Sequence, residues 1–281
     1  MSTCWACGAS RIGAAGWLAP LPFVECAACR FCFRPDLDES ALHAEYAGGD
    51  YESDRSEVYA GEGLEDRRRD ARVRLRFVAE HHPGGTRLLD VGAAGGAFVS
   101  EAAKTGFTAA GIEPSPETAQ FARQELGVDV ATGMVEDADL GEATLGVVTM
   151  WHVLEHLREP ATTLSRIAAA IEPGGILALE VPNAASAIAR RMGPAWPSLE
   201  PDVHVGQYGP RSVTELLGRA GLDPVWVGSV SIAAYYDVWR RWAPGQVVHW
   251  LRWGRRVGTL RHAHPEGHEL LRAVGRRPQP D

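Results

Sequence analysis

The cysteines are the residues whose type and spacing most clearly permit chemistry, and all five lie in the first 32 residues. Four of them form two Cys-x-x-Cys pairs, Cys4 with Cys7 and Cys26 with Cys29. Each pair can wrap a tight turn around one side of a metal ion, and two pairs supply the four thiolates that Zn²⁺ takes in closed structural sites. The spacing therefore predicts a bound Zn²⁺, with Cys32 as a spare thiol.

Other arrangements of these cysteines remain open: Cys32 could replace Cys29 as a ligand, and the pairs could be disulfides or free thiols. Disulfides are disfavoured because residues 1–10 lack a basic segment followed by an apolar one, so no secretory signal is visible and a cytoplasmic location is expected. The spacing, with a Gly- and Pro-rich stretch at 11–24, resembles a zinc ribbon. A closed four-sulfur site has no open position, so its expected role is structural.

Three histidines are the candidate catalytic residues: His152, His156 and His204. An imidazole titrates near neutral pH and suits a general base. Glu155 and His156 follow His152 at i+3 and i+4, so the three side chains can share a face. The alternative is that these side chains only cap a helix or contact a backbone carbonyl.

The elements that must position such residues begin with a short apolar run at 87–91, which leads into the small-residue loop 92–96. A helical pattern follows, then a second strand at 108–112 that ends on Glu113. Small residues let a loop backbone approach a ligand, and an acid about 20 residues later can bind a ribose diol. This unit predicts a nucleotide site at the carboxyl ends of parallel strands. A dinucleotide dehydrogenase, or a simple tight turn, would also fit the glycine loop alone.

Alternating elements continue along the chain and predict an α/β fold, a doubly wound and mainly parallel seven-stranded sheet. The further strands are expected at 128–131, 145–150, 176–181, 222–230 and 269–274, and helices at 66–81, 116–126 and 211–220. His152 then lies just past the carboxyl end of the fourth strand. The long irregular segment 182–210 contains Trp196, a candidate wall of an acceptor pocket.

The strongest family signal is the segment Trp151–Leu157, followed by Pro160 and by the turn at 173–175. With the glycine loop, it resembles class I S-adenosylmethionine (SAM)-dependent methyltransferases of the ubiquinone-biosynthesis and secondary-metabolism type, which have a Rossmann-like fold. The loop residues that match the family's first motif are Asp90, Gly92, Ala94 and Gly96. Ala94 stands where the family has its middle glycine. Gln207 replaces a second histidine of the relatives, and Gly146 stands where they often have an acid.

This resemblance implies that SAM binds at the loop, with its methionine part on 92–96 and its ribose on Glu113. Adenine is then expected between Met134 and Val135, with Glu136 near its amine, and Trp151 is a further cofactor contact. His152 lies beside the expected methyl group. Because methyl transfer chiefly requires alignment, positioning without a side-chain base is the alternative mechanism.

Composition limits the acceptor. Residues 86–237 contain 19 acidic and 9 basic residues, a net charge of −10, which disfavours nucleic acid. We therefore expect a small-molecule acceptor, and the family resemblance implies an oxygen nucleophile in a natural-product pathway. The alternatives are an rRNA or tRNA methyltransferase that uses the zinc module to bind RNA, and a non-catalytic SAM-binding interaction protein.

The expected organisation is a zinc-ribbon-like module at 1–35, a helical linker or lid at 36–85, the SAM-binding core at 86–237, and a basic C-terminal region at 238–281 that completes the sheet. No run of 18 apolar residues predicts a membrane span. Tyr46 and Tyr51 are candidate lid residues. Four C-terminal tryptophans are expected to serve packing or homodimerisation: Trp239, Trp242, Trp250 and Trp253.

Overall fold

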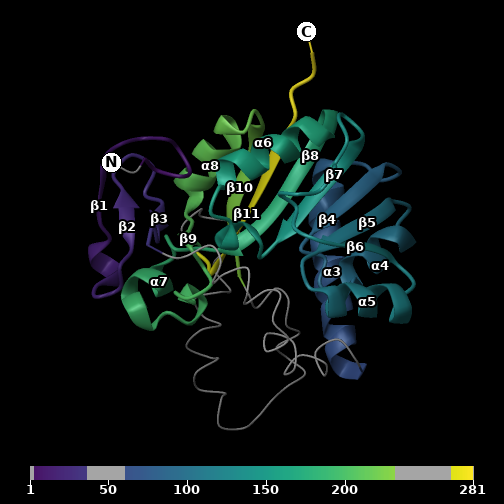
Figure 1. The fold of residues 1–281 in the computed structure, drawn as a ribbon, viewed down its shortest axis with the longest axis horizontal. Coiled ribbons are helices and arrows are strands. Elements are labelled where there is room, and N and C mark those ends of the chain that lie inside the picture. The colour runs from purple at the N-terminus through teal and green to yellow at the C-terminus, as the bar shows by residue number, and fades with distance from the viewer. Residues whose placement is uncertain (1–2, 37–60, 232–266, 281) are drawn as a thin grey trace.

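The computed structural model describes residues 3–36, 61–231 and 267–280, and contains two sheets (Figure 1). The larger sheet has seven strands in the order β10-β11-β8-β7-β4-β5-β6. Its strands are β4 (Arg87–Val91), β5 (Thr108–Glu113), β6 (Asp129–Thr132), β7 (Leu145–Trp151), β8 (Ile171–Pro182), β10 (Asp223–Val230) and β11 (Leu270–Arg276). The helices are α3 (Gly61–His81), α4 (Ala97–Lys104), α5 (Pro116–Glu125), α6 (Pro160–Ala170), α7 (Ala187–Met192) and α8 (Pro210–Arg219).

The strand order places a crevice at the centre of the larger sheet. From β4 the chain runs outward through β5 to β6, and it then returns to place β7 on the other side of β4. The pairs among β6, β5, β4, β7 and β8 are parallel, whereas β11 is antiparallel to both β8 and β10. Ligands bind where the order of parallel strands reverses, outside their carboxyl ends. That position is the junction of β4 and β7.

Both faces of this sheet are covered, which explains why its central strands are almost wholly apolar. Leu88 and Val147 point to the face covered by α3 and α4, whereas their neighbours Leu89 and Val148 point to the face covered by α6 and α8. Every residue of β7 is buried. The period-two alternation of a strand thus divides one apolar run between two cores.

The smaller sheet joins the N-terminal segment to a distant part of the chain. Its order is β1-β2-β3-β9, where β1 (Ile12–Ala14), β2 (Val24–Cys26) and β3 (Cys32–Phe33) pair with β9 (Gly206–Gln207). A Cβ on Gly206 would lie 3.0 Å from the ring of Phe31, so a glycine permits this close approach. The segment predicted as a separate module therefore shares its sheet with residues that follow β8.

The predicted α/β fold is confirmed, and the expected strands of the larger sheet are all present, with boundaries that move by a few residues. Strand β11, near the C-terminus, pairs with both β8 and β10 in this sheet. Tyr46, Tyr51 and the tryptophans between 239 and 253 lie outside the described residues. Within the described ranges, no helix is both long enough and apolar enough to cross a membrane.

Candidate active site

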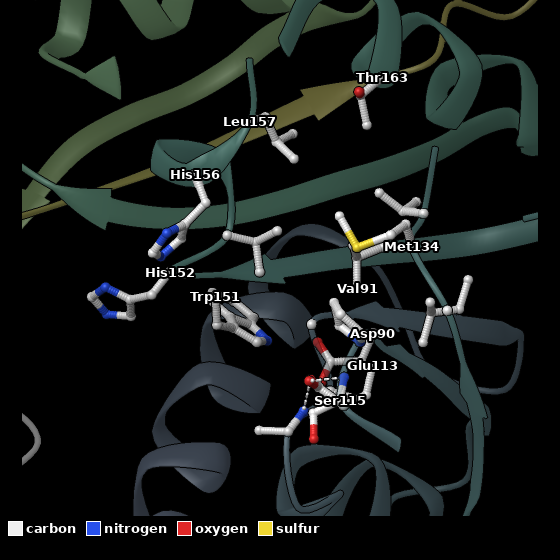
Figure 2. A pocket seen from close by; sticks show the side chains of 18 of the residues that line it. Asp90, Val91, Glu113, Ser115, Met134, Trp151, His152, His156, Leu157 and Thr163 are labelled. Atoms are coloured by element: carbon white, nitrogen blue, oxygen red, sulfur yellow. Dashed lines mark hydrogen bonds between the residues drawn. The ribbon is translucent and has the colours of Figure 1, made fainter. Parts of the chain in front are cut away.

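A cavity of about 790 Å³ opens at the carboxyl ends of β4, β5 and β7. Its lining includes the predicted loop 92–95 and the segment 133–137, and α3 contributes Arg67, Ala71 and Arg74. In Figure 2, Glu113 and Ser115 lie at one end of the cavity, Met134 lies across from them, and His152 and His156 lie together at the other end. The sequence-predicted cofactor and histidine sites thus meet in one space.

The glycine loop adopts a conformation that favours its glycines. Gly92 and Gly96 have φ of +71° and +78°, and Ala94 has φ of +46°, which is a strained value for a residue with a Cβ. A Cβ on Gly92 would lie 2.4 Å from Val153 Cγ2. The Ala94 departure from the family motif therefore falls at a left-handed position of the loop.

Glu113 ends β5 and fixes this loop. The backbone N–H of Ala94 donates to Glu113 Oε2 at 2.8 Å, and the N–H of Ser115 donates to Oε1 at 3.0 Å. Ser115 in turn caps α5, because its side chain accepts from the N–H of Thr118. The carboxylate is thereby oriented at the cavity edge, where it could also accept the hydroxyls of a ribose.

Asp90 lies near the end of the strand beneath the loop and, although almost wholly buried, it also lines the cavity (Figure 2). It is 2% exposed, and Thr149 Oγ1 on β7 donates to its Oδ1 at 2.6 Å. Burial raises the pKa of Asp90 to about 7, although the hydrogen bond from Thr149 opposes the shift. Asp90 therefore links β4 to β7 under the site.

Among the buried polar atoms of the cavity lining that make no hydrogen bond within the described part of the chain, two belong to residues of the expected cofactor site. They are Glu136 Oε2, beside Met134 and Val135, and the indole Nε1 of Trp151. One is an acceptor and the other a donor. Buried polar groups are normally paired, so these two atoms suit a polar ligand that offers both a donor and an acceptor.

His152 follows β7 and is held on several sides. Its backbone N–H donates to the carbonyl of Glu180 at 2.9 Å, and its φ is +60°. Its Nε2 lies 3.2 Å from Glu180 Oε1, and its Nδ1 lies 3.4 Å from Glu155 Oε1. Burial disfavours the imidazolium, but the hydrogen bonds and charges of Glu155 and Glu180 outweigh it and raise the pKa of His152 to about 9.

His156 and His204 lie together, but only His156 lines the cavity. Their ring centroids are 4.6 Å apart with the planes at 78°, and His204 is 6% exposed. The Nδ1 atoms face backbone carbonyls, those of Val203 at 3.2 Å and Ser198 at 3.0 Å. Burial lowers the pKa of His156 to about 4. Contact with a backbone carbonyl is the alternative to a catalytic role that the sequence left open for these histidines.

Trp196 is not a wall of this cavity. It is 4% exposed and packs in a cluster with Leu18, Phe23 and Cys32 of the N-terminal segment. Its large apolar surface is satisfied by this second core, which is why the long segment after β8 needs no ligand to bury it. Gln207 likewise has a structural role, since its Nε2 donates to the carbonyls of Leu199 and His204.

A buried charge cluster escapes sequence analysis altogether. Glu180 of β8 is fully buried and forms ion pairs with Arg74 of α3 at 2.9 Å and Arg272 of β11 at 2.7 Å. Although burial opposes ionisation, Arg74, His152 and Arg272 hold the pKa of Glu180 below its ordinary value. The one available signal was a glutamate within the apolar run 176–181 of this strand.

The four predicted cysteine ligands converge on one point. Their sulfur atoms all lie within 4.8 Å of one another, and the Cys4–Cys29 and Cys7–Cys26 Sγ distances are both 3.6 Å. Tetrahedral Zn²⁺ with bonds of about 2.3 Å separates its sulfurs by roughly 3.8 Å, so the donor set fits the ion. Cys32 lies elsewhere, with its Sγ near the carbonyl of Arg30.

Comparison with known proteins gives the family. A family model described as a methyltransferase domain matches residues 64–226, which is more than half of the chain. The ubiquinone biosynthesis O-methyltransferase of Xanthomonas axonopodis is 34% identical over 118 residues, which cover 40% of this chain and 49% of that enzyme. The chain thus matches about half the length of this relative.

Solved structures show the same fold. A SAM-dependent methyltransferase from Thermotoga maritima has a TM-score of 0.56 at 16% identity, and covers 82% of this chain and 97% of its own. Magnesium protoporphyrin IX methyltransferase from Synechocystis, with S-adenosylhomocysteine (SAH) bound, has a TM-score of 0.55 at 15% identity, covering 85% and 100%. With the family match across the sheet and the cavity, the chain belongs to the methyltransferase domain family.

Proposed function

We propose that this chain is a SAM-dependent methyltransferase that acts on an oxygen nucleophile of a small molecule. The observation that carries the proposal is the cavity at the β4–β7 junction, which combines an oriented Glu113 with buried atoms of Glu136 and Trp151 that make no hydrogen bond to the described residues. Its volume lies within the range of small-ligand sites. The O-methyltransferase relatives favour oxygen as the acceptor atom.

The residues that would hold SAM follow from the polarity of the lining. Glu113 would accept hydrogen bonds from the ribose hydroxyls. Adenine would lie between Met134 and Val135, and Glu136 Oε2 would accept a hydrogen bond from its amine. The loop at 92–96 would face the methionine part, near the indole N–H of Trp151. SAM supplies an electrophilic methyl group on a sulfonium, so the acceptor oxygen forms a C–O bond as the C–S bond breaks and its own proton is lost.

On the acceptor side, the chain contributes alignment and charge. Trp151 packs against Phe98 with ring centroids 5.4 Å apart, and the Arg74 guanidinium lies 5.2 Å from its ring centroid. These ring and cation–π contacts hold Trp151 in place as a wall between the cofactor and histidine ends of the cavity. Fixed walls favour a near-attack geometry, which is the main requirement of methyl transfer.

The test is an assay of SAM turnover with a panel of phenols, aliphatic alcohols and amines. Turnover is measured as the formation of SAH. The proposal predicts turnover with hydroxyl acceptors and little with amines. A structured RNA serves as the competing acceptor. SAH formed only with RNA, or SAH binding without turnover on any acceptor, would overturn the small-molecule assignment.

We further propose that the four-cysteine cluster binds a structural Zn²⁺. Its closed sulfur set leaves no position for substrate, and its loop is tied to the core because Arg219 of α8 donates to the carbonyls of Cys4, Trp5 and Ala6 at 3.4–3.5 Å. Metal analysis of the purified protein should give one equivalent of zinc. The substitution Cys29→Ala should abolish binding and Cys32→Ala should retain it. Equal zinc content in both variants would contradict this ligand set.

A further inference from the structure

The buried cluster around Glu180 ties together four elements beside the cavity. Glu180 comes from β8, Arg74 from α3, Arg272 from β11, and His152 follows β7. A carboxylate with no solvent exposure is tolerated only when it is paired and hydrogen-bonded. Two arginines would already satisfy Glu180, so the third contact, with His152, calls for an explanation of its own.

The geometry around His152 commits both of its ring nitrogens. Nε2 faces the Glu180 carboxylate at 3.2 Å and Nδ1 faces that of Glu155 at 3.4 Å. A neutral imidazole has one N–H and one lone pair, so it would place the lone pair against an anion at one of these contacts. Only the doubly protonated ring places an N–H opposite both carboxylates, in a hydrogen bond to Glu180 and in an ion-pair contact with Glu155. A ring in that state has no lone pair with which to accept a proton from an acceptor.

The backbone holds the ring in this arrangement. The N–H of His152 donates to the Glu180 carbonyl, so Glu180 holds both the main chain and the side chain of the same residue. The left-handed φ of +60° is costly for a non-glycine residue, and such strain persists where surrounding contacts impose it. The His152 side chain remains 38% exposed, and the residue lines the cavity.

We propose that Glu180 is a positioning residue that, together with Glu155, keeps His152 as an imidazolium at neutral pH at the histidine end of the cavity, where the acceptor would bind. There the imidazolium stabilises the oxyanion form of an acidic hydroxyl, such as a phenol, whose proton passes to water rather than to His152. The inference rests on the proposed function and replaces the base role that the sequence predicts for His152 with an electrostatic one.

The charges around His152 support this assignment. The groups that face it are Glu155 and His156 on the following turn, Glu180 on β8, and, through Glu180, Arg74 and Arg272. The arginines neutralise much of the Glu180 charge, whereas the carboxylate oxygens of Glu155 make no hydrogen bond within the described chain. His152 is therefore the nearest cation to a second buried carboxylate.

The test is an NMR titration of the histidine side-chain nitrogens in the full-length protein, with and without SAH. The His152 resonances are assigned by their loss in His152→Gln. In the wild type, both ring nitrogens should show the shifts of an imidazolium near neutral pH and should titrate near pH 9. In Glu180→Gln the His152 titration should move down by about one pH unit or more, because one of two carboxylates is lost.

The matched control is Glu172→Gln, the same substitution on the same strand but at its start, which should leave the His152 titration unchanged. If Glu180→Gln does not fold, Glu155→Gln and the wild-type titration still decide the question. A neutral His152 near pH 7 would overturn the inference. So would a His152 titration that is the same as in the wild type in both Glu180→Gln and Glu155→Gln. Failure to bind SAH by calorimetry would instead count against the proposed function, whatever the state of His152.

Discussion

At the scale of single residues, the site contains titratable groups whose surroundings shift their pKa values in opposite directions. His152, between two carboxylates, has its pKa raised to about 9, whereas burial lowers that of neighbouring His156 to about 4. Two histidines four positions apart are therefore held in different protonation states at neutral pH. The sequence made both candidate bases and placed His152 nearer the expected methyl group, but it did not predict this difference in pKa.

The raised pKa of His152 has a consequence for stability. Since its folded-state pKa lies above the ordinary value near 6.5, its pairing stabilises the fold fully below about pH 6.5 and is lost as the pH rises through about 9. The difference in melting temperature between the wild type and His152→Gln should therefore shrink over this interval. A difference that stays constant over this interval would show that His152 is already neutral in the folded protein at its lower end.

The conformational requirements of single residues could be predicted from the sequence only in part. It noted that Ala94 and Gly146 depart from the family motif, but the reasons are spatial. Ala94 occupies a left-handed position of the loop. A Cβ on Gly146 would lie 2.3 Å from Thr86 Oγ1, so the acid found in relatives has no room here. Neither the φ of Ala94 nor the closeness of Thr86 to Gly146 can be predicted from the adjacent residues in the sequence.

At the scale of elements, the strands of the larger sheet were predictable because parallel strands buried on both faces are short apolar runs bounded by turn residues. The two-residue strand β9 was not, because it has no periodicity of its own and exists only through pairing with β3. The ion pairs of Glu180 were hidden for a related reason, since its partners lie 106 and 92 residues away.

The pairing of β3 with β9 makes the N-terminal module a support for the segment that carries His204. Phe31 packs on Tyr208 with ring centroids 4.7 Å apart, and the N–H of Arg34 donates to the carbonyl of Val205 at 3.0 Å. Two of the cysteines that would bind zinc, Cys26 and Cys29, lie six and three residues before β3. A bound metal ion should therefore also stabilise the conformation of residues 201–208.

Removal of zinc by a chelator should expose the backbone amides of residues 201–208 to hydrogen exchange, because β9 loses the strand on which it pairs. Hydrogen exchange with mass spectrometry gives the measurement, with β4 and β5 as the internal reference that should keep their protection. Unchanged exchange at 201–208 after the metal has left would contradict the supporting role.

At the scale of the whole molecule, the two sheets divide the work. The larger sheet provides the cavity and the cofactor end of the site, and the smaller sheet stabilises the segment behind the histidines (Figure 1). The proposed Zn²⁺ lies outside the cavity, since its four cysteines are absent from the cavity lining. Loss of zinc is thus expected to affect the acceptor end more than SAM binding.

The central claim, that SAM binds at the β4–β7 junction with its ribose on Glu113, is tested most directly by calorimetric titration of SAH. The wild type should bind one SAH, and Glu113→Ala should weaken binding about tenfold or more, or about 1.4 kcal/mol, because charge-assisted hydrogen bonds to the ribose are lost. Glu117→Ala, on the nearby helix α5, should bind as the wild type does. Equal SAH affinity in Glu113→Ala and the wild type, or no binding by either, would contradict the claim.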